Sequence, residues 1–476
     1  MSNGTLQQLA SKGVQDGHLS ISPETSFFKR VYKRVSNYAI ESIDQSVPSL
    51  AWDKEFTTQL SRNGDLMSEL WLVMYVNTAR LATPGADSVY FTNTLGHAMI
   101  KSTSLEVGNN EIDRTTGLHM ELKWEVESDV NRDVNELVLR GNSAQELTNW
   151  TSNGNTLDRD GGQIIQLYVK LPFYFSKSRS QALPVIALQY HDIRVKFQLR
   201  SKAELLVYTN AANKTLDADH LGEIASGSLM CNFVYLDSME RRLFASNAHE
   251  YLIKNIQVSD FHTKASSASR VSAQVVFNHP VTTVMWVVQK KSNVTALDYF
   301  NFERTSGKGD DTITSAVIKF NGSERERARG PLYWRTLTSS EYFNRTPRKN
   351  MYMYSFAQYP LSWWPSGSAN LSRIDNTTLE FTMPTLDADG NAFGEADVTV
   401  IAENFNVVRV QGGMMAKDRE EWETLCLLLL QLLAVKQAKA LPNITGSGKP
   451  LRASCASSIV KTMVTNSGNT TSLICT

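Results

Sequence analysis

Paired cysteines are absent from this sequence, and their absence excludes two kinds of site. The four cysteines, Cys231, Cys426, Cys455 and Cys475, never occur as CxxC, so the usual spacing of a zinc site is missing. Three of them lie near the C-terminus, which leaves one thiol in the body of the chain and no internal disulfide there. We therefore expect the protein to fold in a reducing compartment.

Long apolar runs are absent as well. The first residues, MSNGTLQQLASKG, contain no apolar core like that of a signal peptide. The apolar stretch Leu425–Val435, interrupted only by Gln431, is shorter than the roughly 20 residues that a membrane-spanning helix needs. We expect neither a secretion signal nor a membrane span.

An excess of charge of either sign is also missing. Lys and Arg together number 48, and so do Asp and Glu, which gives a formal net charge of +0. This balance argues against a protein whose task is to neutralise nucleic-acid phosphate, because that affinity comes from surplus Lys and Arg. It also removes long-range repulsion between copies of the chain, which suits self-association.

Catalytic and metal-binding motifs do not occur. The eight histidines are spread singly and form no HxH, HxxxH or HExxH pattern, and Ser366-Gly367 is not part of a GxSxG turn. The neighbours His191 and Asp192 fall in a predicted strand, where successive side chains point to opposite faces. We therefore predict no catalytic residues, no cofactor-binding residues, no metal-binding residues and no cofactor.

One stretch, His191–Arg200, shows the clearest secondary-structure pattern. Polar residues fall on even numbers from Asp192 to Arg200, and apolar residues occupy the odd positions between them, which is typical of a strand with one buried face. Leu167–Phe175 is interpreted as a second strand beside it, bounded by the polar run 176–180. We expect the two to be neighbours in a β-sandwich.

Further strands and turns surround this pair. The nearly all-apolar stretch Leu70–Val76 predicts a strand buried on both faces. The long region from Thr116 to Asn149 predicts a loop with one or two short helices, and residues 150–163 and 201–228 predict loops. Asn or Gly pairs predict tight turns at four places, which are Asn63-Gly64, Gly108-Asn109, Asn321-Gly322 and Gly412-Gly413.

The strand pattern resumes in the second half of the chain. Asn278-His279-Pro280 is expected to end the first strand there, since proline cannot donate to the ladder. The other predicted strands are Val284–Val288, Ile318–Glu324, Met351–Phe356, Leu379–Met383 and Val398–Val410. Short strands with large insertions suit a double-sheet jelly roll.

The N-terminal region divides into two parts. Residues 1–22 are small and polar, with a short helix predicted around Thr5–Ser11, and we interpret them as an arm. The following run, FFKRVYKR at 27–34, permits two hypotheses: a nucleic-acid strip with aromatic stacking, or a strand edge with solvated charges. We favour the strand edge.

The C-terminal region changes character at Lys417. Asp418 and Glu421 form a capping box, Leu425–Val435 follows, and Lys436 and Lys439 suit a helix C-terminus. We predict a helix at about 418–440 that is buried against protein, with membrane contact as the alternative. The rest of the tail is expected to be flexible.

Several long motifs resemble one known family, the major capsid proteins of nucleocytoplasmic large DNA viruses. The resemblance covers roughly residues 20–416, so the tail lies outside it. The motifs that carry it are SFFKRVYKRVSNYAIESI at 26–43, SRNGDL at 61–66, LPFYFSKSRSQALPVIALQYHDIRVKFQL at 171–199, ERRLFASNAHEYLI at 240–253, FNHP at 277–280, KFNG at 319–322, YSFA at 354–357, PSGSANLSRIDNTTL at 365–379 and NFNVVRVQGGM at 404–414.

The resemblance implies an all-β protein with two tandem antiparallel eight-stranded jelly-roll β-sandwiches, long loops, short helices and a C-terminal helical or flexible extension. We place an N-terminal arm at 1–23, the first jelly roll at 24–237, a linker at 238–249, the second jelly roll at 250–416 and the extension at 417–476. The charged linker has few Pro or Gly residues, so we expect it to be semi-rigid.

The function implied by the resemblance is structural, with no enzyme activity. Three copies would form a homotrimeric, pseudo-hexagonal capsomer, and capsomers would tile the icosahedral shell of a large DNA virus. The implied partners are the chain itself, neighbouring capsomers and minor capsid proteins, with the terminal segments as candidates for contact with an internal viral membrane and no specific nucleic acid. The implied location is the virion, after assembly in the host cytoplasm.

A carbohydrate-binding or carbohydrate-active β-sandwich is the alternative. Adjacent Trp363 and Trp364 suit stacking on sugar rings if they are exposed. A glycosidase would also need two carboxylates close together in a cleft, which the sequence alone does not test.

Overall fold

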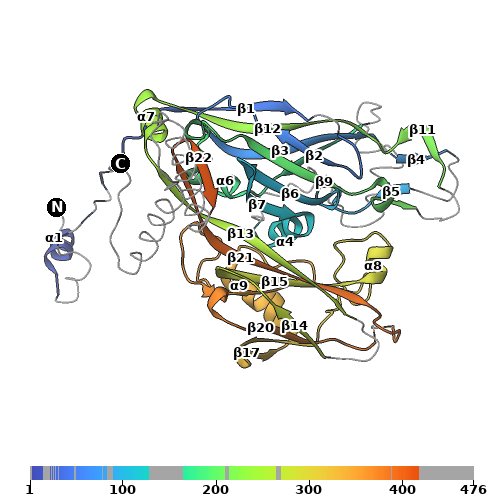
Figure 1. The fold of residues 1–476 in the computed structure, drawn as a ribbon. Helices are drawn as coiled ribbons and strands as arrows, with labels where there is room; N and C mark the ends of the chain where they lie inside the picture. Colours follow the sequence, from blue (N-terminus) through green and yellow to red (C-terminus); the bar gives the residue numbers. More distant parts are fainter. Residues whose placement is uncertain are drawn as a thin grey trace, which may run out of the picture. The chain divides into compact units, whose positions relative to one another are not determined.

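Antiparallel strands are the main secondary structure of both halves of the protein (Figure 1). The structure is a computed structural model, and it describes residues 3–13, 22, 24, 26, 28–29, 32–47, 50–77, 79–82, 89–127, 164–208, 214–263, 270–386 and 389–417. The predictions for residues 150–163 and for the helix at 418–440 fall outside the described residues. Among the described residues, no helix is long and apolar enough to cross a membrane.

In the part of the first half that the structure describes there are twelve strands and several short helices. Its strands are β1 (Tyr38–Ser46), β2 (Glu55–Gln59), β3 (Leu66–Asn77), β4 (Ala79–Leu81), β5 (Val89–Phe91), β6 (Ile100–Val107), β7 (Asn110–Thr116), β8 (Ile164–Lys170), β9 (Ile193–Leu199), β10 (Leu206–Tyr208), β11 (Leu216–Leu221) and β12 (Ile224–Leu236). Its helices are α1 (Asn3–Ala10), α3 (Leu95–Ala98), α4 (Gly117–Glu127), α6 (Tyr174–Lys177), η2 (Arg179–Gln181), η3 (Val185–Ala187) and η4 (Lys202–Glu204), and α7 (Ser238–Ser246) leads to the second half.

The second half has the same composition of long strands and short helices. Its strands are β13 (His249–Thr263), β14 (Arg270–Val275), β15 (Pro280–Lys290), β16 (Ser315–Phe320), β17 (Ser323–Arg329), β18 (Tyr352–Ser355), β19 (Ala369–Asn370), β20 (Thr377–Thr382), β21 (Ala396–Gln411) and β22 (Met414–Lys417). Its helices are α8 (Lys291–Thr295), η5 (Tyr333–Leu337), α9 (Thr338–Tyr342) and η6 (Leu371–Arg373).

Each half is built from two main sheets, which we name after a central strand. The first half has the β3 sheet, in the order β1-β12-β3-β8, and the β9 sheet, in the order β2-β9-β6-β7. The second half has the β15 sheet, in the order β13-β21-β15-β18, and the β16 sheet, in the order β14-β20-β16-β17. The short strands β19 and β22 add to β15 and β21, while β4, β5, β10 and β11 form two small separate sheets.

The two halves share one strand order. When the main strands of each half are counted along the chain, the first and last lie side by side in one sheet, followed by the third and the sixth. The second, seventh, fourth and fifth make up the other sheet in both halves. This is the order of a jelly roll, so the protein is a double jelly roll whose repetition lies in topology and not in sequence.

The apolar core does not stop at the boundary between the halves. One buried cluster, which includes Trp286 and Phe381, fills the space between the β15 and β16 sheets. The other fills the first half and also includes Met285 and Ile401 of the second half. Because these two residues belong to the β15 sheet, its second face is buried against the first half, and one of the two clusters is shared by both halves.

The predicted alternation in β9 is confirmed. Ile193, Val195, Phe197 and Leu199 are all buried, while the residues between them are exposed or half-buried. The neighbouring prediction was wrong in two ways: β8 ends at Lys170, and residues 174–177 form α6. Pro172 lies two positions after Lys170 and cannot donate to a ladder, which explains why the strand does not continue.

The prediction that these two strands are neighbours was also wrong. β8 pairs with β3, whereas β9 pairs with β2 and β6 in the opposite sheet. The region 201–228, predicted as loop, contains β10, β11 and the first residues of β12. There the small polar residues of β12 pair with β3, for example Ser226 with Tyr75, so tertiary pairing overrides a weak local preference.

Three of the four predicted tight turns are confirmed. Gly108-Asn109, Asn321-Gly322 and Gly412-Gly413 all have positive φ angles and close the hairpins β6–β7, β16–β17 and β21–β22. Asn63-Gly64 differs, because neither residue has a positive φ and the turn links strands of opposite sheets. Gly64 instead permits a close approach, since a Cβ there would lie 2.7 Å from the Cβ of Phe233.

Two further predictions need correction. The strand predicted near FFKRVYKR begins only at Tyr38, and Phe28 and Tyr32 are exposed ahead of it. Pro280 does not end a strand but begins β15, a position where its missing N–H costs no ladder bond. The short helix predicted around Thr5–Ser11 is confirmed as α1, and the predicted linker region contains α7.

Candidate functional site: the buried contact between the two halves

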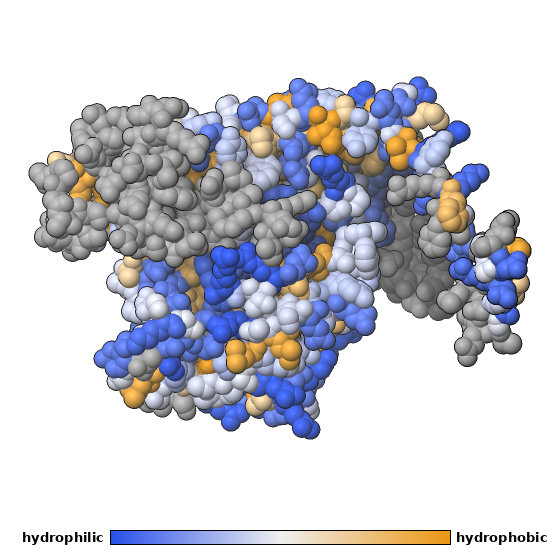
Figure 2. Space-filling view, turned by 180° about the vertical axis from the view of Figure 1, so that it is seen from behind, coloured by the Kyte–Doolittle hydropathy of each residue, from blue (hydrophilic) through white to orange (hydrophobic). Residues whose placement is uncertain are grey.

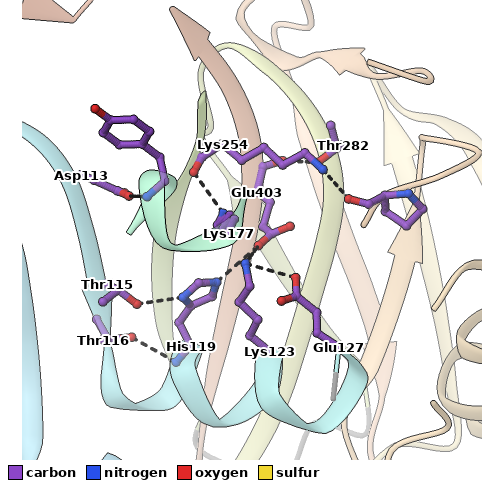
Figure 3. A network of polar contacts seen from close by, with 12 residues as sticks. Asp113, Thr115, Thr116, His119, Lys123, Glu127, Lys177, Lys254, Thr282 and Glu403 are labelled. Carbon is purple, nitrogen blue, oxygen red and sulfur yellow. Dashed lines mark hydrogen bonds and ion pairs between the residues drawn. The ribbon is translucent and has the colours of Figure 1, made fainter. Parts of the chain in front are cut away.

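The helix α4 lies at the boundary between the two halves and carries several of the polar contacts across it (Figures 1 and 3). Its first residue, Gly117, allows the helix to begin close to the backbone before it. A Cβ at this position would lie 2.2 Å from the carbonyl oxygen of His97 and 2.4 Å from that of Ile100. Only glycine fits there, so the sequence fixes where α4 begins and which side chains it directs at the second half.

Glu403 on β21 is the centre of the first polar cluster. Its carboxylate lies 3.3 Å from the Lys123 ammonium and 3.5 Å from Nε2 of His119, and both partners belong to α4. The three side chains are buried. Burial alone would raise the pKa of Glu403, but Lys123 and His119 outweigh burial and hold that pKa well below its usual value.

Lys123 is shared between two carboxylates. Its ammonium also lies 3.1 Å from Glu127, one turn further along α4. Burial would lower the pKa of Lys123, but the negative charges of Glu127 and Glu403 outweigh it and raise that pKa above its usual value. Lys123 therefore stays charged and joins the two halves through an ion pair that is shielded from water.

Two threonines at the end of β7 orient His119. Its Nδ1 lies 2.8 Å from the hydroxyl of Thr115, and its backbone N–H donates to the hydroxyl of Thr116 at 3.2 Å. Burial lowers the pKa of His119, which favours the neutral imidazole. These contacts direct Nε2 at Glu403 (Figure 3).

A second cluster forms around Glu121 on the same helix. Its carboxylate lies 2.7 Å from the Lys349 ammonium of the second half and 2.7 Å from Nδ1 of His97. Nearby, Glu125 accepts a hydrogen bond from the backbone N–H of Arg348 at 3.3 Å. The segment between β17 and β18, which holds residues 348–349, is thus tied to α4 by charge-assisted bonds.

The segment after β8 makes a third set of contacts, which includes two hydrogen bonds to β13. Lys177 donates to the carbonyl of Lys254 at 3.3 Å, and Gln181 donates to that of Leu252 at 2.6 Å. In return Asn255 of β13 donates to the carbonyl of Ile112 in β7 at 3.0 Å. Burial and the nearby Lys123 lower the pKa of Lys177 to about 8.

Asp113 is the buried acid that fixes the start of α6. It accepts hydrogen bonds from the backbone N–H groups of Tyr174 and Arg114, both at 2.9 Å. Burial nevertheless raises its pKa to about 6 because these bonds and the distant Lys177 compensate only part of the lost hydration. Asp113 therefore holds α6 in place, but the free-energy cost of burying its side chain rises when the carboxyl group ionises.

The arrangement can hold two rolls in one relative position, and it offers little else chemically. Buried ion pairs with several hydrogen bonds add specificity of orientation more than net stability. Among the described residues no group of three His, Cys, Asp or Glu side chains is placed to hold a metal ion.

The residues singled out in the sequence lie elsewhere. His191 accepts a hydrogen bond from the backbone N–H of Met415 at 3.2 Å, and burial lowers its pKa. Asp192 is exposed and lies 3.6 Å from Arg194. Ser366 accepts a hydrogen bond from the backbone N–H of Tyr359, so it fixes a loop. The structure brings none of these residues together as a site.

The features that a carbohydrate enzyme would need are weakly represented. An open hollow of about 230 Å³ over the β9 sheet is lined partly by Glu55, Glu106 and Glu111, but Glu106 is occupied by Lys196 at 2.7 Å. Trp363 and Trp364 are exposed, yet their rings lie at 84° to each other. Two rings at this angle offer no common flat surface for a sugar.

Sequence reasoning missed the buried charges of α4. Mixed charges at helical spacing predicted only a long loop with one or two short helices, and the partner Glu403 lies 280 positions from Lys123. The helical spacing itself was visible, but the sequence contains no local signal that such a helix is covered.

Comparison with known proteins gives matches over nearly all of the described chain. A model of the major capsid protein N-terminus matches residues 26–237, and a model of the large eukaryotic DNA virus major capsid protein matches residues 240–416. The major capsid protein of Pyramimonas orientalis virus is 31% identical over 440 residues, covering 86% of this chain and 98% of the relative. That of Paramecium bursaria Chlorella virus 1 is 30% identical, with the same coverage of 86% and 98%.

Solved structures give the same result. The crystal structure of PBCV-1 VP54, fitted into a reconstruction of the virophage Sputnik, matches with a TM-score of 0.68 and 26% identity. The match covers 82% of this chain and 99% of VP54. The Faustovirus major capsid protein matches with a TM-score of 0.63 at 12% identity over 86% of this chain and 96% of that one, which supports the fold alone.

Proposed function

We propose, from the premise that this chain belongs to the family of large eukaryotic DNA virus major capsid proteins, that three copies of it associate into one capsomer made of six jelly rolls. The chain is a structural protein of the virus capsid, and its fold is the double jelly roll. The proposal concerns how this fold performs that task.

The observation that carries the proposal is the repeated strand order. Each chain supplies two rolls of identical topology, and buried contacts such as Lys123 with Glu403 hold them side by side. Three such chains around a threefold axis would place six similar rolls in a ring. A ring of this kind fits a lattice position with six neighbours although it contains only three chains.

The remaining parts of the proposal follow from the same assembly. The segment boundaries are an arm at 1–23, rolls at 24–237 and 250–416, a connection at 238–249 and an extension from 417. Capsomers then contact neighbouring capsomers and minor capsid proteins, with the terminal segments directed at an internal membrane and assembly in the host cytoplasm. The protein performs no reaction, and its work is binding distributed over many interfaces.

Light scattering on the purified protein at moderate salt tests this proposal. The proposal predicts a stable species of three times the chain mass of 53.2 kDa over a wide range of concentration. A species that remains monomeric or dimeric at high concentration would contradict it.

A further inference from the structure

The segment that precedes β1 combines apolar and basic residues at helical spacing. In residues 28–35, FKRVYKRV, the apolar residues stand at positions 28, 31, 32 and 35, and the basic residues occupy the four positions between them. Positions i, i+3, i+4 and i+7 lie on one face of an α-helix, so a helix formed here has one apolar face and one basic face. We call residues 28–35 the basic segment.

The described part of the basic segment leaves its apolar side chains in water. Phe28, Tyr32 and Val35 are 99%, 81% and 86% exposed, and the described residues of the segment lie outside helices and strands. Eight residues are too few for a stable isolated helix in water. The apolar face therefore needs a surface to pack on before the helix can form.

The charge of the basic segment is not balanced nearby. No acidic residue occurs among residues 25–40, although acidic and basic residues are equal in number over the whole chain. Lys29, Lys33 and Arg34 are exposed. The next acid along the chain, Glu41, accepts a hydrogen bond from the Tyr235 hydroxyl at 3.1 Å. The basic segment is thus a local excess of positive charge, complementary to a negatively charged surface.

A second exposed apolar surface lies at the same end of the β3 sheet (Figure 1). Strand pairing places Tyr38, the first residue of β1, opposite Leu236 of β12, and α7 begins two residues later at Ser238. In α7, Met239 and Leu243 lie one turn apart and are 77% and 58% exposed. The chain therefore leaves the basic segment and enters β1 beside an exposed apolar helix face.

Asp65 holds α7 in this position. Its carboxylate accepts a hydrogen bond from the backbone N–H of Leu236 at 3.0 Å and lies 3.0 Å from the Arg241 guanidinium. The next residue, Arg242, is exposed. The face of the protein seen in Figure 2 is mostly hydrophilic, with hydrophobic residues in separate patches. Apolar patches of this kind bind a membrane firmly only together with basic residues.

We infer that the basic segment folds into an amphipathic helix on an anionic lipid surface, with α7 beside it, and so attaches this end of the first roll to a membrane. Its apolar face enters the boundary between head groups and acyl chains, and its basic face binds the negatively charged head groups. The inference deepens the proposed contact of the terminal segments with a membrane, on which it rests, by naming the surface and the class of lipid.

A nucleic acid is the other anionic partner that aromatic and basic residues suit. Aromatic rings stack on bases, but the aliphatic side chains of Val35, Met239 and Leu243 offer no such stacking. An extended strip along a nucleic acid also requires no helical spacing of its apolar residues. The spacing and the aliphatic side chains therefore favour a lipid surface.

Assembly strengthens this contact. Copies related by a threefold axis carry the basic segment at the same height along that axis, so one capsomer has three such segments on one level. Three linked sites bind one surface more tightly than a single site does. A trimer should therefore bind anionic vesicles at lower concentration than a monomer.

Co-sedimentation of the full chain with lipid vesicles tests the inference. One set of vesicles contains phosphatidylcholine alone, and the other contains one third phosphatidylserine. The charge variant carries Lys29→Gln, Lys33→Gln and Arg34→Gln. The exchange variant carries Tyr32→Lys with Lys33→Tyr, which keeps the composition and the net charge but moves the tyrosine to the basic face. All the replaced side chains are exposed, so the rolls should fold as in the wild type.

The matched control removes three exposed arginines from β17, through Arg325→Gln, Arg327→Gln and Arg329→Gln. It loses the same net charge as the charge variant. Glu324 and Glu326 alternate with these arginines, so β17 has no comparable local excess of positive charge.

The expected results separate charge from amphipathic pattern. The wild type and the control should bind the phosphatidylserine vesicles, and both should bind pure phosphatidylcholine at least about tenfold more weakly. The charge variant should bind the phosphatidylserine vesicles at least about tenfold more weakly than the wild type, because each basic residue near an anionic surface adds to affinity. The exchange variant should bind them roughly fivefold or more weakly, because its apolar face is interrupted.

Three results would overturn the inference. The first is equal binding of the wild type to both kinds of vesicle, or equal binding of the wild type and the charge variant. The second is wild-type binding by the exchange variant, which would show that the charges act without a helix. The third is tighter binding of the wild type to a DNA duplex than to the vesicles, which would assign the segment to a nucleic acid.

Light scattering without lipid measures the trimer separately. A wild type that forms trimers but binds no vesicle contradicts this inference and leaves the trimer standing. A wild type that stays monomeric but binds anionic vesicles through the basic segment supports this inference and contradicts the proposed capsomer.

Discussion

Lys123 on α4 lies 3.3 Å from Glu403 on β21, and this buried ion pair links the two jelly rolls of the chain across 280 positions of sequence. Both side chains are only 8% exposed. The pair belongs to the set of polar contacts at the boundary between the two rolls, where one of the two apolar clusters spans both rolls. Its charges fix the relative position of the rolls, because a displaced roll would leave them buried and unpaired.

Replacing one member of this pair should therefore destabilise the protein strongly. Lys123→Met leaves Glu403 buried without its main partner, and we expect a loss of about 3–5 kcal/mol in the free energy of unfolding. Urea denaturation of the purified chain measures it. The control is Lys291→Met, because the pair of Lys291 with Glu395 is largely exposed and should contribute less than about 1 kcal/mol. Equal losses in the two variants would show that burial of Glu403 does not matter.

Stability should depend on pH through Asp113. Burial raises its folded-state pKa to about 6, above the unfolded value, so its contribution is fully present below about pH 4 and is lost as the pH rises through 6. Asp113→Asn removes this titration. We expect the stability of the wild type relative to this variant to fall by roughly 3 kcal/mol between pH 4 and pH 7. If the difference in stability between the wild type and the variant stayed constant across this pH range, the raised pKa of Asp113 would be contradicted.

Lys177 should make the stability of the protein rise with pH, in contrast to Asp113, and at higher pH. Its pKa is lowered to about 8 by burial and by Lys123, so its contribution is fully present above the unfolded value near 10.5 and is lost as the pH falls through 8. Lys177→Met removes the charge. We expect the wild type to gain stability relative to this variant between pH 7 and pH 10 in paired melting experiments. If the wild type instead gained stability relative to the variant on acidification, the lowered pKa of Lys177 would be contradicted.

The start of α4 should tolerate no side chain. A Cβ at Gly117 would lie 2.2 Å from the carbonyl oxygen of His97, so Gly117→Ala must displace the helix and the charges it carries. We expect a loss of at least about 1–3 kcal/mol by chemical denaturation. Gly330→Ala is the matched control, because nothing lies within 4 Å of a Cβ there. Wild-type stability of the Gly117 variant would show that α4 can shift without cost.

The thiol of Cys231 should be inert in the folded protein. Burial raises its pKa to about 12, and the side chain lies in the core of the first roll. We expect peptide mapping after treatment with iodoacetamide at pH 8 to find Cys231 unmodified until denaturant is added. Modification in the native protein, at a rate like that of a free thiol, would show that the first roll opens locally.

Local patterns in the sequence were sufficient for individual elements. The strict alternation of Ile193, Val195 and Phe197 predicted β9, and the pair Asn321-Gly322 predicted the hairpin of β16 and β17. Both signals depend only on neighbours along the chain. The family resemblance supplied the arrangement of these strands into two rolls.

Partners distant in sequence could not be predicted. β8 and β9 follow each other but belong to opposite sheets, because the jelly-roll order is set by which strands meet and not by their succession. The segment with His119 and Lys123 was predicted as a loop with short helices, and nothing local in the sequence indicated that Glu403 lies beside these two residues. The exposure of Trp363 and Trp364, which the carbohydrate alternative required, is confirmed, but the angle between their rings could not be predicted from the sequence.

The most direct test of the central claim is the rotational symmetry of the purified assembly in averaged electron-microscope images. The account predicts particles with six lobes and threefold symmetry, two lobes for each chain. Particles with twofold symmetry, or with two lobes only, would contradict it.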